Sequence, residues 1–132
     1  MGFEIYFQTG VNQPSVLPTL EELRTGLGGA SGDEDTGLVL PPGMGGCWVP
    51  FSTSEDNRVV AFSVDRPTSD EALWEALYRI LTSYHYCAYW PADSPPAFGR
   101  SDMEVVPDII EALGIPRLVS DPADLPRWIR ES

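Results

Sequence analysis

The sequence predicts an α+β (or α/β) fold, in which a mixed β-sheet of about five strands carries a long central helix and about two to three shorter helices. Three observations support this expectation. The stretch from Pro67 to Pro91 has the apolar spacing of a long helix and then changes to strand-forming aromatic residues. The amino-terminal residues alternate between apolar and more polar side chains. Apolar content of 42% over 132 residues is enough for one core, so we expect residues 1–132 to form a single globular domain.

The first expected elements are a strand and a short helix. Residues 3–8 alternate at a period of two, which predicts a strand with one buried face. A proline-containing loop then leads through Pro18 or Thr19 into a short helix, because its leucines recur on one side. The glycines from Gly26 to Gly29 end this helix.

The segment before the long helix is predicted as loops and short strands. The run from Gly28 to Gly37 combines glycine and small polar residues with three consecutive acids, and its lack of periodicity predicts an exposed, mobile loop. Leu38 to Leu40 and Cys47 to Phe51 are expected as short strands, separated by a glycine-rich hairpin or bulge. SEDN at residues 54–57 is a turn by composition. The apolar run in residues 58–64 then predicts a strand covered on both faces.

The long helix should be the main support of the core. Thr68 followed by Glu71 fits a capping box, which places the helix start near Ser69. Glu75 and Arg79 stand four apart in the order that favours an ion pair on the exposed face. The buried face is formed by apolar residues at helical spacing: Leu73, Leu77, Ile80, Leu81 and Tyr84.

After the long helix, residues 85–90 are rich in aromatic residues and predict a strand that Pro91 ends. This strand, the helix and residues 58–64 form a plausible βαβ unit. Its strands are expected to be parallel and its crossover right-handed.

The carboxyl-terminal third is predicted as a helix, an edge strand and a last helix. Residues 106–113 have helical apolar spacing, and Pro107 fits best in the first turn because it lacks an N–H group. Residues 115–119 contain a proline that removes a backbone donor, so we expect an edge strand. Asp121 is a candidate cap for the last helix, with Pro122 at its first position.

The net charge restricts the partners of this chain. Twenty acidic residues against eight basic ones, all of them Arg, give a formal charge of −12. Such a surface repels nucleic acid and anionic membrane, so we expect neither as a partner and expect a basic protein instead. The bland alternative is that the carboxylates only keep a small protein soluble. We expect the protein in the cytoplasm, because no signal-like segment or membrane span is apparent. We expect it to be a monomer or a weak homodimer.

No pattern in the sequence points to catalysis, a cofactor or a metal site. There is no GxSxG, HExxH or Walker motif, and we do not expect an enzyme. Cys47 and Cys87 are too few for a disulfide framework and are expected to be buried thiols. Trp48 and Trp90 lie beside glycine-rich or proline-rich loops, where a half-exposed indole would be a binding anchor.

Three segments carry a resemblance to a known class of protein. A short chain that begins with an FxIYFQ-like strand, runs from a long helix into YxYCAYWP and closes with LGIPRLVSDPADLPRWI resembles small acidic bacterial immunity proteins of polymorphic toxin systems. The resemblance implies a cytoplasmic inhibitor that binds a cognate toxin and blocks its active site. Charge supports the idea, because an acidic inhibitor is steered to a basic cleft and places carboxylates at its phosphate positions.

The candidate partner-binding residues are those acids and the tryptophan that fall in predicted loops. They are Asp33, Glu34, Asp35, Glu55, Asp56, Trp90, Asp93 and Asp102.

Two other classes of function stay open from the sequence. One is a small-ligand-binding or regulatory module, with Tyr86, Trp90 and Trp48 around an apolar pocket. The other is a small enzyme that uses Cys87 and His85, which are two apart on a predicted strand and so share a face.

Overall fold

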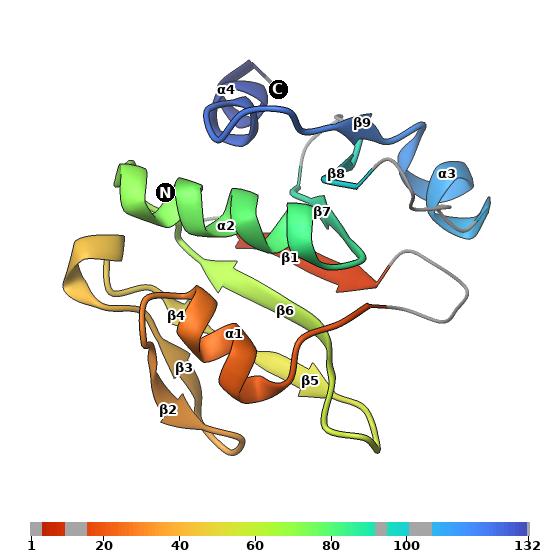
Figure 1. Cartoon of the computed structure of the whole chain (residues 1–132). Helices are drawn as coiled ribbons and strands as arrows, with labels where there is room; N and C mark the ends of the chain where they lie inside the picture. Colours follow the sequence, from red (N-terminus) through yellow and green to blue (C-terminus); the bar gives the residue numbers. More distant parts are fainter. Residues whose placement is uncertain (1–3, 10–15, 92–94, 101–106, 132) are drawn as a thin grey trace.

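The computed structural model describes residues 4–9, 16–91, 95–100 and 107–131. In this part of the chain, a six-stranded mixed sheet runs in the order β5–β6–β1–β7–β8–β9, and a second sheet has the order β2–β3–β4 (Figure 1). Four α-helices accompany the sheets, so the fold is α+β, with more strands than the sequence predicted. None of the helices in the described ranges has the length and apolar character needed to cross a bilayer.

The elements have the following bounds. The strands are β1 (Glu4–Thr9), β2 (Ser31–Asp33), β3 (Gly37–Val39), β4 (Trp48–Val49), β5 (Phe51–Thr53), β6 (Val59–Asp65), β7 (Tyr86–Tyr89), β8 (Ala97–Phe98) and β9 (Arg117–Leu118). The helices are α1 (Leu20–Gly26), the short 3-10 helix η1 (Pro42–Met44), α2 (Glu71–Ser83), α3 (Pro107–Leu113) and α4 (Asp124–Glu131).

Strand β1 is at the centre of the large sheet. It pairs antiparallel with β6 on one side and with β7 on the other, and Phe7 lies opposite both Phe62 and Ala88. Since β6 and β7 both run against β1, they are parallel to each other. The predicted βαβ unit therefore has the expected strand direction, but β1 separates its two strands. Among the described strands, β9 pairs with β8 alone at the far edge of the sheet, which confirms the predicted edge strand.

One face of the large sheet holds the main core. Helices α1 and α2 lie over this face, and their leucines pack against the inward side chains of β1, β6 and β7 (Figure 1). The rings of Phe7 and Phe62 stack at 4.6 Å, and Tyr86 meets Phe62 edge-on at 5.2 Å. The fully buried Tyr86 hydroxyl donates to the carbonyl of Val59 over 2.6 Å. This bond satisfies the one polar atom of the ring cluster.

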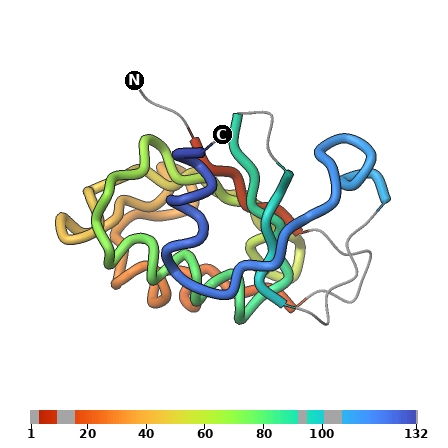
Figure 2. Tube along the Cα trace, turned by 90° about the horizontal axis from the view of Figure 1, so that it is seen from above, coloured from red at the N-terminus to blue at the C-terminus, as the bar shows by residue number. Residues whose placement is uncertain are grey.

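The opposite face of the sheet is only partly covered. Cys87 points there, between Tyr86 and Ala88, and packs against Ile109 of α3. Figure 2 shows α3 apart from the layer formed by α1 and α2. The same face carries the stacked rings of Tyr6 on β1 and Tyr89 on β7, 5.2 Å apart. Next to these rings, over β1, β6 and β5, lies a shallow hollow of about 220 Å³.

The helix starts differ from the predictions. The expected capping box at Thr68 is wrong, because the Thr68 hydroxyl donates to the Asp70 carboxylate and α2 begins at Glu71 after Asp70. The Thr68 carbonyl accepts the indole N–H of Trp74 at 2.8 Å, which holds Thr68 outside the helix. A complete capping box is found instead at α1, where Thr19 and Glu22 bond reciprocally.

Two further details of the long and last helices are corrected. Glu75 and Arg79 do not pair, and neither forms an ion pair with any described residue. Asp121 accepts the N–H of Ala123 as a cap would, but residues 122–123 form a turn and α4 begins at Asp124. The Asp124 carboxylate accepts hydrogen bonds from the backbone N–H groups of Ser120 and Asp121, which fixes the chain at the start of α4. Pro107 is the first residue of α3, as predicted.

The predicted loop from Gly28 to Gly37 is mostly a hairpin, β2 and β3 with a tight turn between them. Gly37 adopts φ +82°, a region that side chains rarely allow, so the turn needs glycine there. Composition concealed the hairpin because its strands are three residues long and contain glycine. The inner face of this small sheet buries Leu38 and Val49 in the main core.

Candidate functional site

The structure places five of the predicted contact residues at the surface and buries a sixth, Trp90. Asp33, Glu34 and Asp35 lie at the turn between β2 and β3, and Glu55 and Asp56 lie at the turn between β5 and β6. All five are exposed.

Trp90 does not have the predicted role of an exposed anchor. It is only 5% exposed and belongs to the main core, because the residues after β7 continue into the interior. Asp93 and Asp102 lie outside the described residues.

Helix α1 connects the two acidic turns. The Arg24 guanidinium donates to the carbonyl of Gly32 at 2.9 Å and so ties α1 to the β2–β3 hairpin. Arg58, next to the β5–β6 turn, donates to the carbonyl of Leu17 at 3.1 Å and to the carboxylate of Glu22 at 3.3 Å. The first turn of α1 therefore lies between the two turns, and all three segments face the bottom of Figure 1.

We call this surface the acidic edge. Its members are Glu21, Glu22, Asp33, Glu34, Asp35, Glu55 and Asp56. Its seven carboxylates stand against the two guanidinium groups of Arg24 and Arg58, which leaves a formal charge of −5. Both arginines are engaged with glutamates of α1. Among the described residues, the carboxylates of Glu34, Asp35 and Glu55 have no hydrogen-bond or ion-pair partner, so they are available to a cation from outside.

Hydrogen bonds keep several of these carboxylates ionised. The backbone N–H of Thr36, the Thr36 hydroxyl and the N–H of Asp35 all donate to Asp33 and lower its pKa. The Ser54 hydroxyl donates to Asp56 over 2.6 Å and lowers that pKa. The backbone N–H of Thr19 has the same effect on Glu22. These groups therefore carry full charge at neutral pH.

Trp48 is an exposed aromatic residue beside the acidic edge. Its side chain is 49% exposed, and its indole N–H donates to the carbonyl of Thr36 at 2.8 Å. A Cβ atom on Gly37 would lie 2.8 Å from the indole nitrogen, so the ring packs directly over that glycine. Val39, opposite Trp48 in the sheet, is 45% exposed. Trp48 thus forms a fixed, half-exposed apolar anchor next to the acidic turn.

Sequence reasoning identified part of this surface. It named Trp48 as a rim candidate but placed Trp90, not Trp48, in the contact set. It also missed Glu21 and Glu22, which the capping signature of Thr19 and Glu22 could have placed in an exposed first turn.

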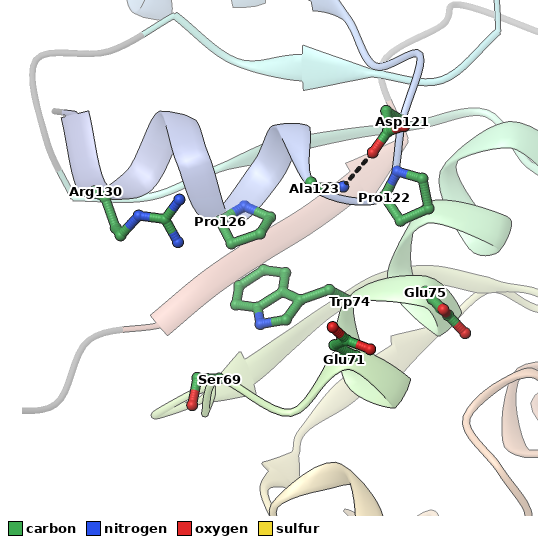
Figure 3. Close-up of a pocket in the computed structure, with 9 residues that line it drawn as sticks. All are labelled: Ser69, Glu71, Trp74, Glu75, Asp121, Pro122, Ala123, Pro126 and Arg130. Atoms are coloured by element: carbon green, nitrogen blue, oxygen red, sulfur yellow. Dashed lines mark hydrogen bonds between the residues drawn. The ribbon is translucent and has the colours of Figure 1, made fainter.

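A concave surface, separate from the acidic edge, lies between α2 and α4 and has a volume of about 390 Å³ (Figure 3). We call it the α2–α4 cleft. Trp74 lies in its middle, opposite Pro126, with acidic residues on one side of the indole and Arg130 on the other. The lining residues are Ser69, Glu71, Trp74, Glu75, Asp121, Pro122, Ala123, Pro126 and Arg130. Sequence reasoning did not predict this cleft, because α2 and α4 are far apart in the chain.

The aromatic pocket expected for a small-ligand module is absent from the described structure. Tyr86 and Trp90 are buried within the main core, whereas Trp48 lies on the outer surface of the small sheet. The three side chains therefore do not surround a common cavity.

The structure also does not support nucleophilic chemistry at Cys87 and His85. Cys87 is fully buried against Ile109, and burial raises the pKa of its thiol to about 11, so it stays protonated at neutral pH. The Nδ1 atom of His85 accepts the backbone N–H of Val16 at 2.9 Å, a structural bond to the preceding loop. Cys47 is likewise a buried, unbridged thiol, as predicted. Within the described ranges, no three His, Cys, Asp or Glu side chains are placed to hold a metal ion.

Comparison with known proteins gives no family for this chain. No protein-family model, no curated protein and no solved structure matches it.

Proposed function

We propose that this protein is an immunity-type inhibitor, which binds a basic toxin domain through the acidic edge and blocks it. The observation that carries the proposal is the arrangement of the edge. Carboxylates from three separate segments line one edge of the molecule, and the fixed, half-exposed Trp48 lies beside one of these segments, the β2–β3 turn. Carboxylates needed only for solubility would not need to line one edge next to a fixed aromatic side chain.

The charge of the edge suits a basic cleft. A toxin that acts on nucleic acid or nucleotides must bind phosphate, so its active site is lined with Lys and Arg. An acidic surface is steered to such a cleft and places carboxylates where phosphates would lie. The hydrogen bond from Arg24 to Gly32 and the contact of Arg58 with Glu22 hold α1 against both turns, so these three segments need little rearrangement on binding.

Trp48 supplies the apolar part of the contact. Binding hot spots are often tryptophans surrounded by polar groups that exclude water. The indole of Trp48 is held by one hydrogen bond to Thr36 and by contact with Gly37, so it loses little rotamer freedom on binding. We expect Trp48→Ala to weaken binding by about 2 kcal/mol or more, which is roughly thirty-fold in Kd.

The test begins with a cross-linked capture of partners by the tagged chain from its own host. The captured protein is identified, produced separately and tested for its ability to arrest cell growth. Co-expression of this chain should restore growth, and Trp48→Ala combined with Glu34→Gln and Asp35→Gln should restore it poorly.

A matched control carries the same loss of charge elsewhere on the surface. Asp108→Asn with Glu111→Gln on α3 removes two exposed carboxylates far from the edge and should protect cells like the wild type. The proposal fails if the captured partner is acidic, if it has no effect on growth, or if the edge variant and the α3 variant protect equally.

A further inference from the structure

The α2–α4 cleft is lined by residues from α2, α4 and the loops before them, and shares no residue with the acidic edge. Helix α4 lies at the top of Figure 1, whereas the three segments of the acidic edge face the bottom, so the proposed inhibition does not account for the cleft. We infer that this cleft is a second binding site, which takes a basic amino acid carrying a free carboxylate, either alone or at the end of a peptide. The inference rests on the polarity of the cleft and does not depend on the proposed function.

The charged groups of the cleft are separated into two ends. In Figure 3, Glu71 and Glu75 lie on one side of the Trp74 indole and Arg130 lies on the other. Among the described residues, none of these three side chains has a hydrogen-bond or ion-pair partner. Opposite charges thus line one cavity without neutralising each other. A ligand with a cationic end and an anionic end would satisfy both.

The helix itself gives no reason for this arrangement. Glu71 and Glu75 are four residues apart on α2, a spacing at which like charges destabilise a helix. Glu71 is favoured by its place in the first turn, but Glu75 is beyond that turn and does not pair with Arg79. Asp121 adds a third carboxylate from the loop before α4. A bound cation would relieve this repulsion.

The middle of the cleft is apolar and held in place. The Trp74 indole N–H donates to the carbonyl of Thr68 at 2.8 Å, which fixes the ring, and Pro126 faces it. An aliphatic stem can pack on these surfaces, and a cationic head can interact with the indole as well as with the carboxylates. Arginine and lysine combine such a stem and head with an α-carboxylate that would reach Arg130.

The test measures four ligands by isothermal titration calorimetry, with the indole N–H signal of Trp74 as the NMR reporter of the site. The ligands are L-arginine, L-arginine amide, the peptide Gly-Gly-Arg and L-norleucine. L-arginine should bind and shift the Trp74 signal. The amide, which lacks the carboxylate, and norleucine, which lacks the cationic head, should each bind about ten-fold more weakly. A preference between L-arginine and Gly-Gly-Arg distinguishes a free amino acid from a peptide end as the natural ligand.

Variants separate the two ends of the cleft. Glu75→Gln should weaken L-arginine and its amide alike by about ten-fold, whereas Arg130→Gln should weaken L-arginine and leave the amide unchanged. Glu111→Gln and Arg79→Gln are the charge-matched controls, and both should bind like the wild type. The inference is overturned if no ligand moves the Trp74 signal, if the controls act like the cleft variants, or if Arg130→Gln affects both ligands equally.

Discussion

At the residue scale, the two tryptophans beside loops show what sequence reasoning can and cannot place. Trp48 and Trp90 have similar neighbours in the chain, with proline and small residues close by. Strand alternation decides between them only when the buried face of each strand is known. Val49 points into the core, so Trp48 points outward, whereas Trp90 is carried into the interior after β7.

The turn carboxylate Asp33 should titrate below the ordinary range of aspartate. Three donors favour its charged form, so its folded pKa lies below the unfolded value of about 3.9. Its contribution to stability is then present above the unfolded pKa and is lost as the pH falls through the folded pKa. Carboxyl carbon shifts of Asp33 followed by NMR against pH should give a midpoint below 3.9. A midpoint at or above that value would mean that these three hydrogen bonds to Asp33 do not form in solution.

Cys87 should resist alkylation in the folded protein. The thiol is fully buried, and its pKa of about 11 leaves almost no thiolate at neutral pH. Mass spectrometry after iodoacetamide treatment should show an unmodified Cys87 under native conditions and a modified one in denaturant. Rapid labelling of the folded chain would return the thiol to consideration as a nucleophile.

At the element scale, α1 matters more than its seven residues suggest, because it joins both acidic turns. The true capping box also belongs to α1. Thr19→Ala removes the hydroxyl that accepts the N–H of Glu22 and should lower the free energy of unfolding by about 1 kcal/mol. Urea unfolding measures this difference.

Thr68→Ala is the matched comparison for that variant, since Thr68 has the same motif spacing without the cap. It should cost less than Thr19→Ala. A larger loss at Thr68 would mean that α2 is capped there after all.

The β2–β3 hairpin depends on glycine at one position for two reasons. Gly37→Ala forces a side chain into φ +82° and drives its Cβ atom against the Trp48 indole, so we expect a loss of about 2 kcal/mol. Gly29 has a similar φ of +78° but open space around it, so Gly29→Ala should show only the backbone cost, about 1 kcal/mol. Thermal unfolding of the two variants separates the backbone cost of a positive φ from the steric clash with Trp48. Equal losses of stability would mean that the Trp48 ring does not pack on Gly37.

At the scale of the whole molecule, the sequence predicted most elements and the α+β class but not their arrangement. Apolar periodicity identified the long helix, an uninterrupted apolar run identified the strand in residues 58–64, and aromatic composition identified the strand in residues 85–90. It could not show that β1 would insert between β6 and β7, since strand pairing depends on contacts between distant segments. The candidate site followed the same rule. The sequence showed that most of its acids lie in turns. Only the fold showed that α1 links the two turns and that α2 and α4 enclose a cleft.

The central claim is that the acidic edge is the surface on which a basic partner is bound. Hydrogen exchange measured by mass spectrometry, on the chain alone and in complex with its captured partner, tests this claim most directly. We predict that binding slows exchange in α1, in the β2–β3 hairpin and around the β5–β6 turn, and leaves α3 unchanged. Protection confined to α3, to the open face of the large sheet or to the α2–α4 cleft would contradict the claim.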